Sequence, residues 1–234
     1  MNNFNLMILA AGYGKRMEIL TKLKPKPLLI VRNKELLSHT IDFFLSLGCD
    51  KIVINTHYLR NMINDFILKN YHKKNIELIY EPILLDTGGG IKNALEILKN
   101  RNFLITNSDI LWDENNKEDV KNFIDKYKMV KTCKLLLSKG DKFKGLKKPK
   151  GDFALENNLI KRWKYNDRLL YFSGLQIINS NIFKGFDNKC FSINEVWDSL
   201  IAKMKLEGEI MNSTLSHIGD INSYDKINKN FSLE

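Results

Sequence analysis

The sequence has few cysteines, few prolines and no long apolar segment. Its three cysteines, Cys49, Cys133 and Cys190, form no Cys-x-x-Cys pair and are too sparse for a disulfide framework. No stretch approaches the roughly 18 consecutive apolar residues that a membrane helix requires. Hydrophobic residues make up 44% and charged residues 27% of the 234 residues, which excludes a disordered or collagen-like chain. We therefore expect a globular, cytoplasmic protein.

Basic residues outnumber acidic residues by 37 to 27, which gives a net charge of +10. Such an excess is compatible with nucleic acid, an anionic membrane surface or phosphorylated substrates. Lysine dominates the basic set, and asparagine and isoleucine are abundant, as A/T-rich codon usage would give without a polyanionic partner. No recognisable nucleic-acid-reading motif accompanies the charge. We expect neither nucleic acid nor a membrane as a partner, and oligomeric state cannot be inferred from the sequence.

Short apolar segments rich in β-forming residues alternate with segments of helical periodicity through the first half of the chain. This alternation is typical of βαβ units around a mainly parallel sheet. In segment 35–47 the apolar side chains recur on one helical face, as in a helix that packs on a sheet. The predicted strands are Asn5–Ala11, Lys51–Asn55, Ile76–Tyr80 and Asn102–Thr106, and the predicted helices are Glu35–Leu47, Tyr58–Lys69 and Gly89–Leu98.

The second half of the chain has a more mixed pattern, with a hairpin turn predicted at Asn157–Asn158. No internal repeat, low-complexity linker or clear boundary is evident, so we expect one domain over residues 1–234. The pattern favours an α/β fold with a mixed, mainly parallel central sheet and a small antiparallel insertion. The predicted elements are strands at Thr132–Leu137, Asp152–Glu156, Leu159–Lys164 and Leu169–Asn179, and helices at Ile193–Leu206 and Ser223–Asn230.

A glycine-containing turn, Gly12-Tyr13-Gly14, follows the first predicted strand. The carboxyl end of such a strand is where an α/β sheet normally opens its ligand crevice. Small residues there let backbone N–H groups approach a phosphate closely. The turn does not match the dinucleotide-binding pattern because Met17 replaces its third glycine, and no Gly-Lys-[Ser/Thr] follows as in a P-loop. A tight strand-to-helix turn without a ligand is the structural alternative.

Two basic residues follow this turn. Arg16 comes directly after it, and ten residues later Lys26 stands between Pro25 and Pro27, whose rings stiffen the backbone. An arginine beside exposed amides and a lysine on a rigid support form a site for several phosphates. Considered alone, Lys26 would be an ordinary surface lysine, but together with the turn it favours a polyphosphate site.

The combined motif, Leu9-Ala10-Ala11-Gly12-x-Gly14-x-Arg16-Met17 and then Pro25-Lys26-Pro27, resembles the signature of the sugar-1-phosphate nucleotidylyltransferases. The resemblance implies a Rossmann-like, three-layer α/β/α fold. Larger relatives carry an additional left-handed β-helix domain, which we do not expect in this chain. It also implies that a nucleoside triphosphate and a sugar 1-phosphate are the partners. In that family the loop wraps the triphosphate, the arginine contacts its phosphates, and the lysine holds the phosphates of the reacting pair. Arg16 and Lys26 are therefore expected to be catalytic.

Further segments continue the resemblance along nearly the whole chain. Glu81-Pro82 and Leu85–Gly90 match the base-binding stretch, where backbone groups read the base and the glycines give it room. Asn107-Ser108-Asp109 matches a motif that presents a metal-binding, catalytic aspartate, and Phe172-Ser173-Gly174 matches a segment of the sugar pocket. The resemblance implies nucleotide binding by Leu9, Ala11, Gly12, Gly14, Lys15, Glu81, Thr87, Gly88, Gly89 and Asn107, and sugar-phosphate binding by Gly151, Asp152, Lys164, Ser173 and Gly174.

The expected metal site departs from the family pattern at its second carboxylate. Mg²⁺ typically takes one or two carboxylates plus substrate phosphates. Asp109 supplies the first, but His217 stands where relatives carry an aspartate, in a Trp-x-Asp-Val-Gly-Thr motif. Three interpretations remain open: His217 ligates an ion that tolerates imidazole, such as Mn²⁺; Asp220 takes over the carboxylate role; or the site is impaired.

The resemblance implies in-line attack of a sugar-1-phosphate oxygen on the α-phosphorus of a nucleoside triphosphate, with release of pyrophosphate. The overall likeness is greatest to N-acetylmuramate-1-phosphate uridylyltransferases, followed by mannose-1-phosphate guanylyltransferase-like proteins. Two alternatives remain. One is cytidylyl transfer to phosphocholine, against which the run Thr87–Gly90 argues; the other is a catalytically silent nucleotide or sugar-phosphate sensor, suggested by His217.

Overall fold

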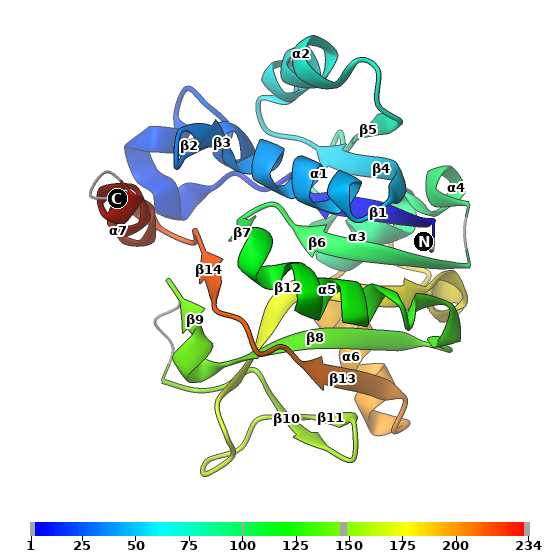
Figure 1. Cartoon of the computed structure of the whole chain (residues 1–234). Helices are drawn as coiled ribbons and strands as arrows, with labels where there is room; N and C mark the ends of the chain where they lie inside the picture. The colour runs from blue at the N-terminus through cyan, green and yellow to red at the C-terminus, as the bar shows by residue number, and fades with distance from the viewer. Residues whose placement is uncertain (1–2, 100, 146–148, 232–234) are drawn as a thin grey trace.

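The computed structural model describes residues 3–99, 101–145 and 149–231, and a nine-stranded sheet lies at its centre (Figure 1). The strand order is β10–β11–β13–β8–β12–β6–β1–β4–β5. Within the described residues, β12 and β11 run against the other seven strands, so the sheet is mixed and mainly parallel, as predicted. The strands are β1 (Phe4–Leu9), β4 (Cys49–Thr56), β5 (Ile76–Tyr80), β6 (Asn102–Asn107), β8 (Cys133–Lys139), β10 (Phe153–Glu156), β11 (Leu159–Arg162), β12 (Leu170–Asn179) and β13 (Leu206–Ile210).

Helices cover both faces of the sheet and make the three layers. Figure 1 shows α1 and α5 in front of the sheet and α3 and α6 behind it. The first face is covered by α1 (Leu36–Ser46), α2 (Arg60–Tyr71) and α5 (Lys117–Ile124), and the second by α3 (Asp86–Asn93), α4 (Leu95–Leu98) and α6 (Ile193–Ala202). Short 3-10 helices are η1 (Lys15–Thr21), η2 (Lys26–Leu28), η3 (Glu114–Asn116), η4 (Tyr127–Met129), η5 (Gly140–Lys142) and η6 (Ser180–Gly185).

The alternation of side chains along the central strands explains why both faces are covered. In β1, Leu6 and Ile8 enter the hydrophobic cluster beneath α1, whereas Met7 enters the cluster beneath α3 and α6. Successive side chains of a strand point to opposite faces, so a strand that is apolar at every position needs a partner layer on each side. All three side chains are fully buried.

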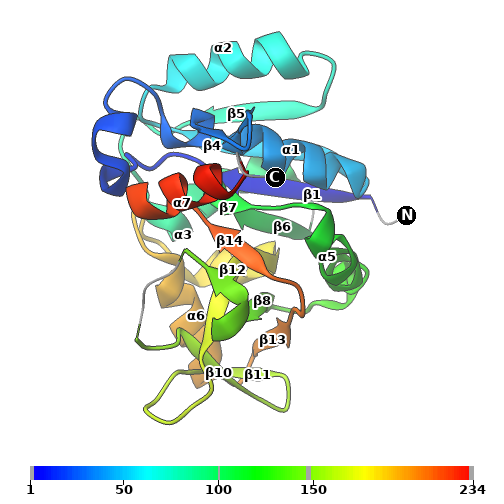
Figure 2. The same ribbon diagram turned by 60° about the vertical axis from the view of Figure 1, so that its left-hand side comes forward.

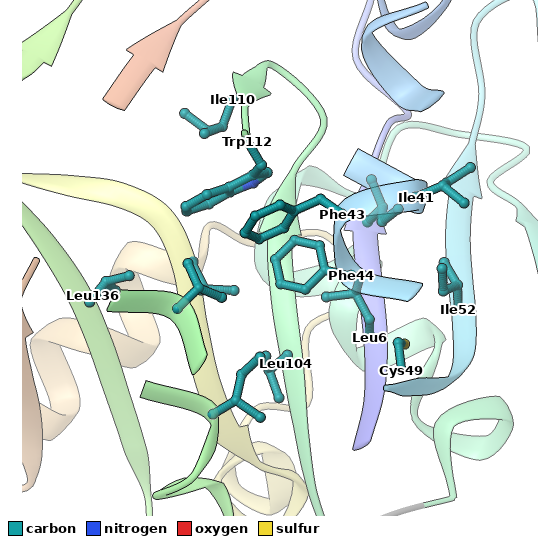
Figure 3. Packing of buried hydrophobic residues seen from close by; sticks show 14 of the residues in the cluster. Leu6, Ile41, Phe43, Phe44, Cys49, Ile52, Leu104, Ile110, Trp112 and Leu136 are labelled. Atoms are coloured by element: carbon teal, nitrogen blue, oxygen red, sulfur yellow. The ribbon is translucent and has the colours of Figure 1, made fainter. Parts of the chain in front are cut away.

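An aromatic group ties the end of β6 to α1. Figure 3 shows Trp112 beside Phe43 and Phe44, with ring centroids 5.8 and 5.9 Å away. The Trp112 indole N–H donates to Thr106 Oγ1 at 3.1 Å. This packing fixes the segment that follows Asp109.

The predicted helix Ile193–Leu206 is too long at its carboxyl end. The helix ends at Ala202, because Met204 adopts a left-handed conformation with φ 53°, and Leu206 begins β13 beside β8. The predicted helix Gly89–Leu98 is divided at Ala94 into α3 and α4, and α3 begins earlier, at Asp86. The hairpin turn at Asn157–Asn158 is confirmed, with φ of 50° and 63°.

Two small sheets lie beside the main one. The first joins β7 (Ile110–Leu111), β14 (Leu215–His217) and β9 (Phe143–Lys144), and the second is the hairpin of β2 (Ile30–Val31) and β3 (Lys34–Glu35). After β14, helix α7 (Ile221–Phe231) packs back toward η1 and the hairpin, as Figure 2 shows. The chain therefore brings its last strand and helix to the glycine turn near its start. Among the described helices, none has the length and apolar character needed to cross a membrane.

Candidate active site

Two adjoining cavities open at the carboxyl ends of β1 and β6. The larger has a volume of about 680 Å³, the smaller one of about 400 Å³, and Leu9, Asp86, Thr87 and Asn107 border both. This is the edge at which a parallel sheet normally binds its ligand. The larger cavity is also lined by Ala10, Ala11, Gly12, Gly14, Lys15, Arg16, Lys26, Pro27, Asn55, Glu81, Leu84, Ser108, Asp109, Cys190 and Gly219.

The glycine turn lies against Lys26. Gly14 has φ 66°, and a Cβ atom at this position would lie 3.0 Å from Lys26 Cβ. A side chain there would therefore be strained and would push the turn away from the lysine. Arg16 is exposed at the cavity, as is Lys15, whose ammonium lies 5.6 Å from the centre of the Tyr13 ring. The turn and η2 thus place three basic side chains, Lys15, Arg16 and Lys26, around one cavity.

Lys26 and Asp109 form a partly buried ion pair. Lys26 is 9% exposed, and its Nζ lies 2.7 Å from Asp109 Oδ2. Pro25 and Pro27 flank the lysine in the short helix η2, which fixes the backbone on both sides of it. Two residues that the sequence predicts to be catalytic, 83 positions apart, are therefore in direct contact.

The strand pair β7–β14 brings His217 to Asp109. His217 pairs with Ile110 across the two strands, the Ile218 N–H donates to the Asp109 carbonyl at 2.8 Å, and His217 Nε2 lies 3.3 Å from Asp109 Oδ2. Burial alone would raise the pKa of Asp109, but the Lys26 ammonium and the His217 imidazole outweigh it and hold this pKa well below its usual range. Among the described residues, Asp109 Oδ1 and His217 Nδ1 have no hydrogen-bond partner.

Asp220 caps a helix in this structure, and its part in ion binding stays a prediction. Its Oδ1 accepts a hydrogen bond from the Ser223 N–H at 2.8 Å, and its own N–H donates to Ser223 Oγ at 3.1 Å. This is the arrangement of a residue that caps the start of a helix, here α7. Asp220 borders neither cavity. In the part of the chain that the structure describes, no group of three His, Cys, Asp or Glu side chains is placed to hold an ion.

A buried network connects Glu81 to the glycine turn. Glu81 is fully buried; its Oε1 accepts from Asn55 Nδ2 at 2.7 Å and its Oε2 from the Leu85 N–H at 3.1 Å. Asn55 Oδ1 in turn accepts from the Ala10 N–H at 2.9 Å. The carboxylate therefore fixes both the start of the turn and the loop before α3. Asn55 was missed by sequence reasoning; its position at the end of β4 is the signal that could have identified it.

The glycine run in the first half of α3 serves packing. Cβ atoms on Gly88 and Gly89 would lie 2.5 Å from the Phe191 ring and 2.2 Å from the Lys189 carbonyl. These glycines let α3 approach segment 189–191 closely, and neither borders a cavity, whereas Thr87 does. In this structure, segment 189–191 fills the space beside these glycines.

The smaller cavity contains part of the expected sugar site. Asp152 borders it, and its Oδ2 accepts from the Phe172 N–H at 3.1 Å. Ser173 and Gly174 instead lie in an irregular stretch of β12, where the pairing with β8 shifts register between Phe172 and Gln176. Gly151 and Lys164 also border neither cavity. The bulge in β12 places Phe172 and Gln176 at the cavity, rather than Ser173 and Gly174.

Apart from Phe172, which belongs to the segment that resembles the sugar pocket, the remaining walls of this cavity were missed by sequence reasoning. They combine aromatic, aliphatic and polar side chains from β10, β11, β12 and the start of α6. Because these residues are far apart in the sequence, only the folded sheet brings them together. They are Phe153, Arg162, Phe172, Gln176, Ser192, Ile193, Asn194 and Trp197.

Comparison with known proteins agrees with this geometry. The family model described as nucleotidyl transferase matches residues 5–142, more than half of the chain. The chain belongs to this family. It is a nucleotidyltransferase, and the matched region contains the glycine turn, Lys26, Glu81 and Asp109.

Individual relatives extend the similarity. The chain is 28% identical over 222 residues to an N-acetylmuramate alpha-1-phosphate uridylyltransferase of Caulobacter vibrioides, which covers 92% of this chain and 91% of that protein. It is 40% identical over 110 residues to a protein of the same name from Neisseria meningitidis serogroup B, over 46% and 47% of the two chains. The crystal structure of HddC from Yersinia pseudotuberculosis, complexed with GMP-PN, shares the fold with a TM-score of 0.78 at 20% identity, over 97% of this chain and 99% of that one.

Proposed function

We propose that this protein transfers a nucleotidyl group from a nucleoside triphosphate to a sugar 1-phosphate and releases pyrophosphate. The specific reaction that we propose is UTP with N-acetylmuramate 1-phosphate to give UDP-N-acetylmuramate. The observation that carries the proposal is the pair of adjoining cavities, the larger lined by the glycine turn, Arg16, Lys26 and Asp109. Two relatives with the corresponding name support the choice of substrates.

The reaction needs no side-chain nucleophile, because the attacking phosphate is already anionic near neutral pH. The chemical problem is to bring two polyanions together. Arg16, Lys26 and the amides of the turn face the larger cavity, where their positive charge would neutralise the phosphates and orient them in line. Catalysis therefore consists of positioning and charge stabilisation.

A divalent cation is part of the proposal. Asp109 Oδ1 has no hydrogen-bond partner among the described residues, and His217 lies beside the same carboxylate. One carboxylate and one imidazole next to a phosphate cavity suit Mn²⁺ as well as Mg²⁺, with substrate phosphates and water as further ligands. When bound, such an ion supplies positive charge to the phosphate oxygens.

The test is a matrix of nucleoside triphosphates against N-acetylmuramate, N-acetylglucosamine, mannose and glucose 1-phosphates, with pyrophosphate as the readout and Mg²⁺ and then Mn²⁺ as the ion. We expect pyrophosphate only when both substrates are present, and most with UTP and N-acetylmuramate 1-phosphate. Tight nucleotide binding without turnover under any ion would instead identify a silent sensor.

Guanylyl transfer to mannose 1-phosphate is the second candidate. A mannose-1-phosphate guanyltransferase of Gibberella zeae is 37% identical over 112 residues, which are 46% of this chain and 30% of that protein. The same matrix separates the two reactions, because this candidate requires GTP with mannose 1-phosphate to give the highest rate.

Replacing His217 with aspartate should change the preferred ion. The substitution restores a pair of carboxylates beside Lys26, a ligand set that Mg²⁺ favours over imidazole. We expect the ratio of Mn²⁺- to Mg²⁺-supported turnover to fall about tenfold, with a rise in the Mg²⁺-supported rate. An unchanged ratio of Mn²⁺- to Mg²⁺-supported turnover would contradict a role for His217 as a metal ligand. Unchanged or lower Mg²⁺-supported turnover would exclude the interpretation that the metal site of the native chain is impaired.

Alkylation of Cys190 should report occupancy of the larger cavity. Cys190 is exposed and borders it, whereas Cys49 and Cys133 are buried. Burial raises the pKa of Cys49 to about 12 and also raises the pKa of Cys133, so iodoacetamide should modify Cys190 first. Nucleotide at ten times its Kd should slow this labelling about tenfold, measured by mass spectrometry, since only the unliganded fraction reacts. An unchanged rate at saturation would place the nucleotide elsewhere, and a Cys190→Ser variant is the labelling control.

A further inference from the structure

The side-chain amide of Gln176 has a fixed orientation at the wall of the smaller cavity. Gln176 is 1% exposed and lies in β12 directly after the bulge. Its Oε1 accepts from the Trp197 indole N–H at 3.0 Å and from the Cys133 thiol at 3.4 Å. An indole N–H can only donate, so the amide atom that faces it must be the oxygen. The NH₂ group therefore points away from Trp197 and Cys133.

This NH₂ group is a donor available to a ligand. Gln176 borders the smaller cavity, and its Nε2 has no hydrogen-bond partner among the described residues. Because Nε2 is not among the buried side-chain atoms that lack a partner, it reaches the cavity, where a ligand can supply its acceptor. Arg162 in the same wall already donates to Asp198 and Asn194.

The walls around Gln176 select the kind of acceptor. The Trp197 ring packs edge-on against Phe172 and Phe153, with centroids 4.9 and 5.6 Å away, and all three rings border the cavity. A sugar hydroxyl that accepted from Gln176 would need a second acceptor for its own proton, because Gln176 Oε1 is already engaged by Trp197. An amide carbonyl accepts without a proton of its own, and an attached methyl group can pack on the rings. The site thus matches an acetamido group better than a hydroxyl.

We propose that Gln176 is a specificity-determining residue that donates to the carbonyl of a 2-acetamido group on the sugar 1-phosphate. The proposal rests on the proposed function, and it narrows the substrate class to N-acetylated amino-sugar 1-phosphates. Because a site built to hydrogen-bond a substrate group rejects analogues that lack it, glucose 1-phosphate should be a poor substrate.

The test compares N-acetylglucosamine and N-acetylmuramate 1-phosphates with glucose 1-phosphate, by steady-state kinetics and by calorimetric binding. N-acetylglucosamine 1-phosphate and glucose 1-phosphate differ only at the 2-substituent. In the native protein, we expect kcat/KM and affinity for the two acetamido sugars to exceed those for glucose 1-phosphate by about a hundredfold. Q176E keeps the size of the side chain and the acceptor for Trp197 but replaces the NH₂ group with oxygen. At pH 8.5 the ratio of kcat/KM for the acetamido sugars to kcat/KM for glucose 1-phosphate should fall at least tenfold, mainly through the KM of the acetamido sugars.

Cys133→Ala is the matched control, because it removes the second donor to Oε1 and leaves the NH₂ group in place. It should keep the native preference. Equal affinities for the sugars in the native protein, or a preference that survives in Q176E, would overturn the role of Gln176. If the preference in binding is found and is lost in Q176E while no pyrophosphate is released, the specificity proposal is supported and the proposed reaction alone fails. If none of the sugar 1-phosphates binds, both proposals fail.

Discussion

Replacing Lys26 with methionine should lower kcat/KM for pyrophosphate release by a factor of about 100 to 1,000. The ammonium group is held at the larger cavity by the turn and by two prolines, so its position is set before the substrates bind. A well-placed donor at a developing charge contributes about 3 kcal/mol to the transition state. Methionine keeps most of the length and apolar volume and removes only the charge, and the measurement is steady-state release of pyrophosphate under saturating divalent ion.

The matched control for this variant is Lys22→Met. Lys22 is exposed, lies four positions earlier and borders neither cavity, so the same change of charge there should alter kcat/KM less than twofold. Loss of the Lys26 charge leaves Asp109 with His217 as its remaining neighbour, so thermal unfolding must also be recorded for each variant. A folded Lys26→Met protein with native activity would remove this lysine from the mechanism.

The central sheet and the phosphate-facing turn were predictable because their determinants are local. Segments such as Ile76–Tyr80 carry the strand pattern in a few consecutive residues, and that strand has the predicted bounds. The turn and Lys26 belong to one motif of about twenty residues, and the fold places both at the same cavity. The resemblance assigned Lys26 to the phosphates and Asp109 to the metal, but their direct contact appears only in the folded chain.

The smaller cavity was not predictable in the same way, because its walls depend on packing between distant elements. Gln176 is directed by a bulge whose register is defined only when β12 pairs with β8. Arg162 occupies the place at the cavity that the motif comparison gave to Lys164, because the β10–β11 hairpin ends with Arg162 paired to Phe153. Hydrophobic periodicity assigns the strands but does not determine which of their side chains border the same space.

The metal site could also be predicted only in part from the sequence, as the position of His217 shows. Its neighbour Asp109 is 108 residues away, and the short pairing of β14 with β7 brings them together. The sequence showed that a histidine replaces the expected aspartate, but left Asp220 as an equal alternative. In the structure, Asp220 caps the start of α7 through Ser223, whereas His217 lies beside Asp109, an arrangement that favours His217 as the second ligand.

Replacing Asp109 with asparagine should lower kcat/KM about a thousandfold and weaken its dependence on the divalent ion. Asparagine keeps the shape of the side chain but removes the charge that pairs with Lys26 and would attract the ion. The measurement is pyrophosphate release across a titration of Mg²⁺ and of Mn²⁺. The pKa of Asp109 lies below its ordinary value of 3.8, so its charge stabilises the fold above that pH and ceases to do so as the pH falls through the folded-state pKa. The stability difference between native and variant chains should therefore be larger at pH 7 than in strong acid.

Asp220→Asn is the control variant for the Asp109→Asn measurement. An asparagine oxygen can still accept from the Ser223 N–H, so α7 should keep its cap and the variant should melt within a few degrees of the native chain. If Asp109 with His217 forms the ion site, Asp220→Asn keeps near-native rates while Asp109→Asn does not. Equal losses in both variants would instead place the second ligand at Asp220 and require α7 to move toward the cavity when the ion binds. A native rate of pyrophosphate release in Asp109→Asn would contradict the charge-based mechanism. In that variant no carboxylate at position 109 pairs with Lys26 or attracts the ion.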